Sequence, residues 1–115
     1  MTRAGRGWEG EELACRHLEA QGFRILARNW RCRLGEIDLV AEEAGTLVFA
    51  EVRLRRNARY GGAAESITAA KRARLLAAAR LYLAGCAPAP CRFDVLLLDA
   101  LEAPRVEWIR GAFGE

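Results

Sequence analysis

The sequence predicts a single α/β domain in which a mixed central sheet of about five strands is flanked by helices. The chain has 115 residues, the size of one domain, and 52% of them are hydrophobic, which is enough for a core. Two segments have helical periodicity, and five have the alternation or short apolar runs of strands. No composition shift marks a linker. We therefore expect one domain over residues 1–115, with residues 1–6 as a flexible N-terminal arm.

The first helix is expected over residues 8–21. Ala14, Cys15 and Leu18 form an apolar stripe at helical spacing there, and Gly22 suits the C-terminal cap.

Three strands follow. Residues 23–30, "FRILARNW", alternate between apolar and polar side chains, as a half-buried strand does. Residues 36–43, "EIDLVAEE", and residues 46–55, "TLVFAEVRLR", are separated only by Ala44 and Gly45. This spacing predicts a β-hairpin.

A polar, glycine-containing loop is expected over residues 56–65, before a second helix. Ser66 or Thr68 could cap this helix, which reaches Leu83 with Gly85 just past its end. The last two strands are the apolar run "RFDVLLLD" (residues 92–99) and the shorter "RVEWIR" (residues 105–110).

The charge distribution is mildly basic, with a net charge of +3 and 29% charged residues, which indicates neither disorder nor a charged tail. The 18 basic residues include a single lysine, Lys71. Guanidinium groups can bind phosphates bidentately, although a solvated charged face explains the pattern equally well. The dense groups that could contact a nucleic acid include Arg31, Arg33, Arg55, Arg56 and Arg59.

The sequence offers no membrane segment. Its first residues lack the apolar run of a signal peptide, and the most apolar helical stretch, residues 75–84, is short and carries Arg80. We therefore expect a cytoplasmic protein that has no membrane partner.

The hairpin suggests a functional site. In an antiparallel pair with Ala44 and Gly45 as the central turn residues, the numbers of opposed residues sum to a constant. Asp38 then faces Glu51 and Glu36 faces Arg53, all on one face of the sheet. A slip of one residue would break this arrangement. The other face is expected to carry Ile37, Leu39, Val48, Ala50 and Val52.

Asp38 and Glu51 repel each other in such a pair. If half buried, one carboxylate must take up a proton or find a cation. Mg²⁺ is a natural candidate because it prefers oxygen ligands and takes only one or two carboxylates from a protein. The structural alternative is an ion-pair ladder in which Arg31 and Arg53 neutralise the acids.

Glu11 is a third acid of interest. It shares the apolar stripe of Ala14, Cys15 and Leu18, where acids are uncommon. The alternative is a solvent-facing position near the start of the helix, favoured by the helix dipole.

These residues carry a resemblance to a known family. The blocks "GEELACRHLEAQGFRILARNWR", "GEIDLV", "LVFAEVRLR", "YGGAAESITAAKRARLLAAARLYL", "CRFDV" and "IRGAF" resemble, in order and spacing, the YraN-like family of small bacterial proteins. The resemblance covers nearly the whole chain. That family is similar to archaeal Holliday junction resolvases and to the restriction-endonuclease-like superfamily, whose signature is an Asp followed by a D/E-x-K element.

The resemblance implies a nuclease-like domain with a restriction-endonuclease-like fold. Asp38 matches the signature aspartate and Glu51 the acid of the second element, while Glu11 resembles the helix-borne acid of the resolvases. Asp38 and Glu51, with the Val52 carbonyl, would hold Mg²⁺ or Mn²⁺. The chain departs from the pattern at Arg53, which stands where the superfamily has lysine. Arginine stays charged and is a poor general base, although it could hold a phosphate. Lys71 could fill the gap.

Three functions follow as hypotheses. The first is a metal-dependent endonuclease that hydrolyses phosphodiester bonds in DNA, with Asp38, Glu51, Arg53 and Glu11 as catalytic residues. Its arginines and Lys71 would track the DNA backbone without reading sequence. The resemblance implies a preference for branched or junction DNA and makes a homodimer plausible. The second is a catalytically inactive nucleic-acid-binding module of the same fold. The third is an interaction protein that docks through the tail "RVEWIRGAF".

Overall fold

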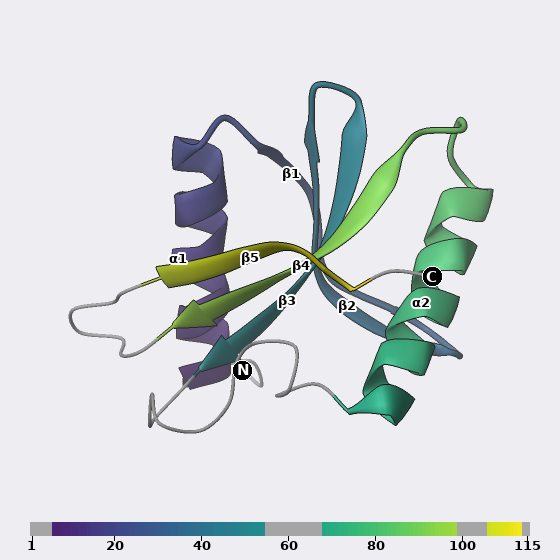
Figure 1. The fold of residues 1–115 in the computed structure, drawn as a ribbon. Helices are drawn as coiled ribbons and strands as arrows, with labels where there is room; N and C mark the ends of the chain where they lie inside the picture. Colours follow the sequence, from purple (N-terminus) through teal and green to yellow (C-terminus); the bar gives the residue numbers. More distant parts are fainter. Residues whose placement is uncertain (1–5, 55–67, 99–105, 114–115) are drawn as a thin grey trace.

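The computed structural model describes residues 6–54, 68–98 and 106–113. Within these ranges the chain forms two helices and five strands in the predicted order (Figure 1). The predicted loop at residues 56–65 and residues 1–5 of the predicted arm lie outside the described residues, and Arg6 already belongs to the first helix. The elements are α1 Arg6–Ala20, β1 Arg24–Cys32, β2 Gly35–Glu43, β3 Thr46–Leu54, α2 Ala69–Ala84, β4 Cys91–Leu98 and β5 Val106–Phe113.

The five strands form one mixed sheet in the order β1-β2-β3-β4-β5. Strands β3 and β4 are parallel, and the other neighbouring pairs are antiparallel. A parallel pair needs a long crossover, and α2 lies in the segment that joins β3 to β4. The predicted α/β class with a mixed five-stranded sheet is confirmed, and it is consistent with a restriction-endonuclease-like fold.

The two helices cover opposite faces of the sheet (Figure 1). On one face, Leu18 of α1 packs in a core with Leu39 and Leu96. On the other face, Leu75 of α2 packs in a second core with Phe49. The sheet is thus buried on both sides, so a polar side chain between its strands is shielded from water.

Gly22 ends α1 as predicted. Its φ of 94° lies in the left-handed region, which favours glycine. The N–H of Phe23 donates to the carbonyl of Leu18 and the N–H of Gly22 to that of Glu19, both at 3.0 Å, which is the Schellman pattern. The cap turns the chain directly into β1.

Thr68 caps α2 at its N-terminus. Its hydroxyl accepts a hydrogen bond of 3.1 Å from the backbone N–H of Lys71. Gly85 closes the other end, as predicted, and donates from its N–H to the carbonyl of Tyr82. Lys71 therefore lies in the first turn of a helix whose start is fixed by a hydrogen bond.

Gly35 brings the start of β2 against α2. A methyl group at this position would lie 2.9 Å from the backbone oxygen of Arg74. Real side chains do not come so close to a carbonyl, so the contact requires glycine.

Asp94 forms a buried polar centre between β4 and β5. Its carboxylate is fully buried and accepts hydrogen bonds from the indole N–H of Trp108 at 2.8 Å and the backbone N–H of Gly111 at 2.9 Å. The guanidinium of Arg92 donates to it as well, at 3.1 Å. The register of β4 and β5 shifts at this level, where Gly111 has a φ of 61°. Asp94 thus satisfies a backbone group that the irregular ladder leaves unpaired.

Candidate functional site

The candidate site forms where β2 separates from β3. The two strands pair from Glu43 and Thr46 up to Leu39 and Ala50. The numbers of all paired residues have the same sum, so the predicted register is confirmed over this stretch. The next residue, Asp38, accepts a hydrogen bond of 2.9 Å from the backbone N–H of Val52 through its carboxylate. A side chain thus replaces the β2 backbone as the partner of β3.

The prediction that Ile37 and Leu39 share one face of the sheet is wrong. Ile37 packs with the core beneath α2, whereas Leu39 packs with the core beneath α1. The regular alternation of β2 is interrupted at Asp38, whose carboxylate bonds to the backbone of β3.

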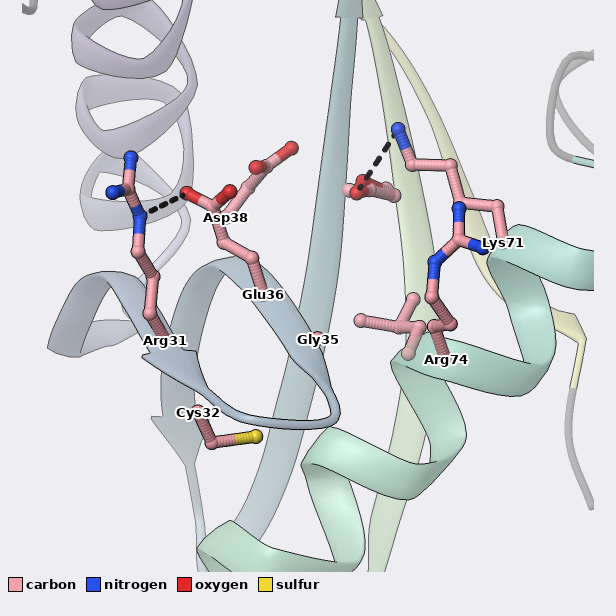
Figure 2. A pocket seen from close by; sticks show the side chains of 9 residues that line it. Arg31, Cys32, Gly35, Glu36, Asp38, Lys71 and Arg74 are labelled. Carbon is pink, nitrogen blue, oxygen red and sulfur yellow. Dashed lines mark ion pairs between the residues drawn. The ribbon is translucent and has the colours of Figure 1, made fainter.

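Glu51 lies beside Asp38 in a pocket of about 480 Å³. Its side chain is buried, with the residue only 3% exposed, and the ammonium nitrogen of Lys71 lies 3.9 Å from its Oε2. In Figure 2, Lys71 and Arg74 of α2 extend from one side of the pocket, and Arg31, Glu36 and Asp38 lie on the other. The charged lining residues are Arg31, Glu36, Asp38, Glu51, Lys71 and Arg74.

Burial raises the pKa values of both acids. Burial raises the pKa of Glu51, and the negative charge of Asp38 raises it further, to about 8, against the opposing effects of Lys71 and Arg53. The pKa of Asp38 is raised mainly by burial, although the hydrogen bond from Val52 opposes this effect. Without a cation, the pair therefore retains a proton at neutral pH.

We expect the metal-free protein to lose stability as the pH rises. Between the ordinary pKa of 4.5 and the folded-state pKa of about 8, the folded protein binds more protons at Glu51 than the unfolded chain does. The contribution of Glu51 is complete below pH 4.5 and is lost towards pH 8. Within this window, the free energy of unfolding should fall by about 1 kcal/mol per pH unit.

Urea unfolding with EDTA at a series of pH values measures this effect. Glu51→Gln supplies the comparison, because it keeps the shape of the side chain and removes the titration. The free energy of unfolding of wild type should fall relative to that of Glu51→Gln as the pH rises. If the free energy of unfolding depended on pH in the same way in both proteins, the predicted titration of Glu51 would be contradicted.

Glu11 is buried, with only 6% of the residue exposed, so the solvent-facing alternative is wrong. Its Oε1 accepts a hydrogen bond of 2.9 Å from the side-chain amide of Asn29 in β1. Glu11 does not line the pocket, yet its negative charge is among the causes that raise the pKa of Asp38, after burial. The structure therefore brings a third acid near the pair.

The structure describes three of the arginines predicted to contact a nucleic acid or the acids: Arg31, Arg33 and Arg53. Arg53 lowers the pKa of Glu51 by its charge, after the larger effects of burial, Asp38 and Lys71. Arg31 is exposed at the pocket rim and pairs with Glu36 at 3.4 Å. Arg33 is exposed in the turn between β1 and β2. Arg55, Arg56 and Arg59 lie outside the described residues.

Two residues near the site were missed by sequence reasoning. Arg74 lines the pocket three residues after Lys71, and helical spacing could have identified it. Asn29 contacts Glu11 from a neighbouring element, and its sequence context gives no signal of this contact.

Comparison with known proteins gives a consistent result. Residues 10–98 match the family model described as "Uncharacterised protein family UPF0102". A UPF0102 protein of Nitrosomonas europaea is 50% identical over 117 residues, which cover 100% of this chain and 99% of the relative. A UPF0102 protein of Pseudomonas aeruginosa is 50% identical, with 94% of this chain and 91% of the relative covered. A UPF0102 protein of Methylobacillus flagellatus is 51% identical, with 93% of this chain and 95% of the relative covered.

Neither described helix is long and apolar enough to cross a membrane. The family match extends from the first turns of α1 to the end of β4, and so includes Glu11, Asp38, Glu51 and Lys71. The resemblance to the YraN-like family is thereby confirmed: the chain belongs to the uncharacterised protein family UPF0102.

Proposed function

We propose that this protein is a metal-dependent endonuclease that hydrolyses phosphodiester bonds in DNA, with branched or junction DNA as its preferred substrate. The observation that carries the proposal is the meeting of Asp38, Glu51 and Lys71 at the point where β2 leaves β3. Two acids and an amine in one pocket supply both a cation site and a group that can handle a proton.

The donor set fits a hard divalent cation. Oε1 of Glu51 is buried and receives no hydrogen bond from the described residues. The N–H of Val52 meets Asp38, and because the N–H and C=O of one strand residue point to the same side, the Val52 carbonyl points into the same gap. The described residues contain no cluster of three or more His, Cys, Asp or Glu side chains at metal-binding distances. Two carboxylates suit Mg²⁺ or Mn²⁺, which keep water and substrate phosphate as their other ligands.

Each residue then has a separate role. Asp38 and Glu51 would hold the cation, which would supply a bound water of lowered pKa and polarise the phosphate. Lys71 is close enough to Glu51 to orient the attacking water or accept its proton, the task that Arg53 cannot perform because it stays charged. Arg53 stabilises the negative charge that builds on the phosphate.

Basic side chains around the pocket suit a nucleic-acid backbone. Arg31, Lys71 and Arg74 line it, and Arg33 is exposed on the adjoining turn. Such contacts give affinity that depends on salt and little on sequence. The preference for branched DNA comes from the resemblance to junction resolvases, whose two-fold substrates also favour a homodimer.

The presence of arginine rather than lysine at position 53 favours a second candidate, a DNA-binding module of the same fold that does not catalyse cleavage. Arginine in place of the motif lysine removes the amine that the superfamily uses. Lys71 favours the nuclease over the inactive module, because it brings an amine from α2 to Glu51.

Cleavage of labelled DNA tests the proposal. A four-way junction, a flapped duplex and a plain duplex are incubated with the protein and Mg²⁺ or Mn²⁺. We expect metal-dependent cleavage of the branched substrates, and a loss of at least about 100-fold in Asp38→Asn and in Glu51→Gln. The control is Glu43→Gln, which removes an acid from the opposite end of β2 and should retain activity.

Two other results would exclude nuclease activity. Binding without cleavage under either metal supports the inactive module, and Arg53→Lys should then be tested for recovered activity. Absence of both metal and DNA binding supports the interaction protein.

A further inference from the structure

Asn29 has an unusual backbone conformation for a residue inside a strand. Its φ is 52°, in the left-handed region that only glycine, asparagine and aspartate adopt with ease. Among the described residues, the other non-glycine residue with a positive φ is Ala44, which lies in the turn between β2 and β3. Strained positions of this kind are often retained where they serve a site.

The side chains of β1 stop alternating regularly between the two faces of the sheet near Asn29. Ala27 and Trp30 both pack towards the core beneath α2, although positions three residues apart point to opposite faces of a regular strand. Asn29 lies between them. Its left-handed conformation therefore rotates the remainder of β1.

The alternation of side chains between the two faces is also interrupted on β2, at Asp38. Ile37 and Val40 both pack beneath α2, and they pair with Trp30 and Ala27 across the strands. Asp38 is the position opposite Asn29, because the paired residues on either side enclose both. The two strands thus rotate together, and the Asp38 carboxylate points to the N–H of Val52.

Asn29 also contacts Glu11 directly. Its side-chain amide donates to Glu11 at 2.9 Å, on the face covered by α1. One residue is therefore linked to two acids: to Asp38 through the path of its backbone, and to Glu11 through its side chain.

We propose that Asn29 is a positioning residue that orients two acids, Asp38 and Glu11. Its left-handed backbone directs Asp38 towards β3, and its amide holds Glu11 beside the pair. The role of Asn29 in cleavage rests on the proposed function, whereas its role in directing Asp38 does not.

Hydrogen exchange of the Val52 amide tests the first role without metal or DNA. Asn29→Gly retains access to the left-handed conformation, and Asn29→Val excludes it because valine is β-branched. We expect Val52 protection to stay within about threefold of wild type in Asn29→Gly and to fall more than tenfold in Asn29→Val, with amides of the central strand β4 as the reference. Strand propensity alone predicts the opposite order, because valine favours strands and glycine weakens them.

Ala44→Gly is the matched control, since it introduces glycine at the same φ far from the acids, and it should leave Val52 protection unchanged. Equal protection in Asn29→Gly and Asn29→Val, or better protection in Asn29→Val, would overturn the proposal.

Mn²⁺ titration and cleavage assays test the second role. Asn29→Gly should bind Mn²⁺ within about threefold of wild type but cleave at least tenfold more slowly at saturating DNA, because Glu11 loses the hydrogen bond that Asn29 donates. Unchanged cleavage would overturn this role. Should wild type neither bind Mn²⁺ nor cleave DNA, the proposed function fails, and Val52 exchange still decides whether Asn29 directs Asp38.

Discussion

Lys71→Met is expected to slow DNA cleavage by about 100- to 1,000-fold, the lower part of the usual contribution of a general acid or base. The amine lies 3.9 Å from Glu51, and Arg53 offers no replacement because its guanidinium does not give up a proton. Binding of Mn²⁺ should be unchanged or tighter, because Lys71 competes with a cation for the charge of Glu51. Single-turnover rates at saturating DNA, with Mn²⁺ titration in parallel, measure the two effects separately.

Two further variants define what Lys71 does. Lys71→Arg keeps the positive charge and removes the group that can exchange a proton, so it should remain slow; full activity would show that charge alone suffices. Lys71→Met combined with Arg53→Lys should recover part of the rate, because it returns an amine to β3. Arg80→Met, which removes an exposed charge from the same helix, is the control and should cleave normally.

Asp94→Ala is expected to reduce the free energy of unfolding by about 3 kcal/mol, the lower end of the cost of breaking a buried ion pair. The substitution removes the acceptor for Trp108, Gly111 and the partly exposed Arg92 at once. Donors left without a partner inside the sheet carry the full cost of lost hydration. Urea unfolding followed by circular dichroism measures the loss.

Asp94→Asn and Glu42→Gln give the comparison. The asparagine keeps one acceptor oxygen and should cost less than the alanine. Glu42 pairs with the exposed Arg24 on the sheet surface, and its loss should change stability by less than about 1 kcal/mol. A loss below 1 kcal/mol in Asp94→Ala would contradict a stabilising role for the buried network.

Local sequence patterns predicted the fold well. The two-residue separation at Ala44 and Gly45 was enough to set the register of the hairpin, because paired positions follow directly from the turn. The apolar stripe of α1 offered a core-facing position for Glu11 as one of two open alternatives, and Glu11 is indeed buried. Gly22, Thr68 and Gly85 marked helix ends because caps depend on neighbouring residues alone.

The parts that the sequence did not predict depend on residues from distant elements. The face change at Asn29 and Asp38 breaks strand alternation, and nothing in the local pattern signals it. The distance from Lys71 to Glu51 depends on how α2 packs on the sheet. Asp94 bonds to Trp108 and Gly111 of β5, the next strand, where the register of the two strands shifts, and the local pattern gives no signal of this shift.

The contact of Gly35 with the backbone of Arg74 has a consequence for how the site works. Since no side-chain atom separates them, the hairpin that carries Asp38 and the helix that carries Lys71 are in direct backbone contact. We expect this close packing to resist sliding of the two elements past each other, and so to help fix the spacing between acid and amine. A substrate would then meet groups that are already in place, and the binding energy it gains need not be spent on assembling them.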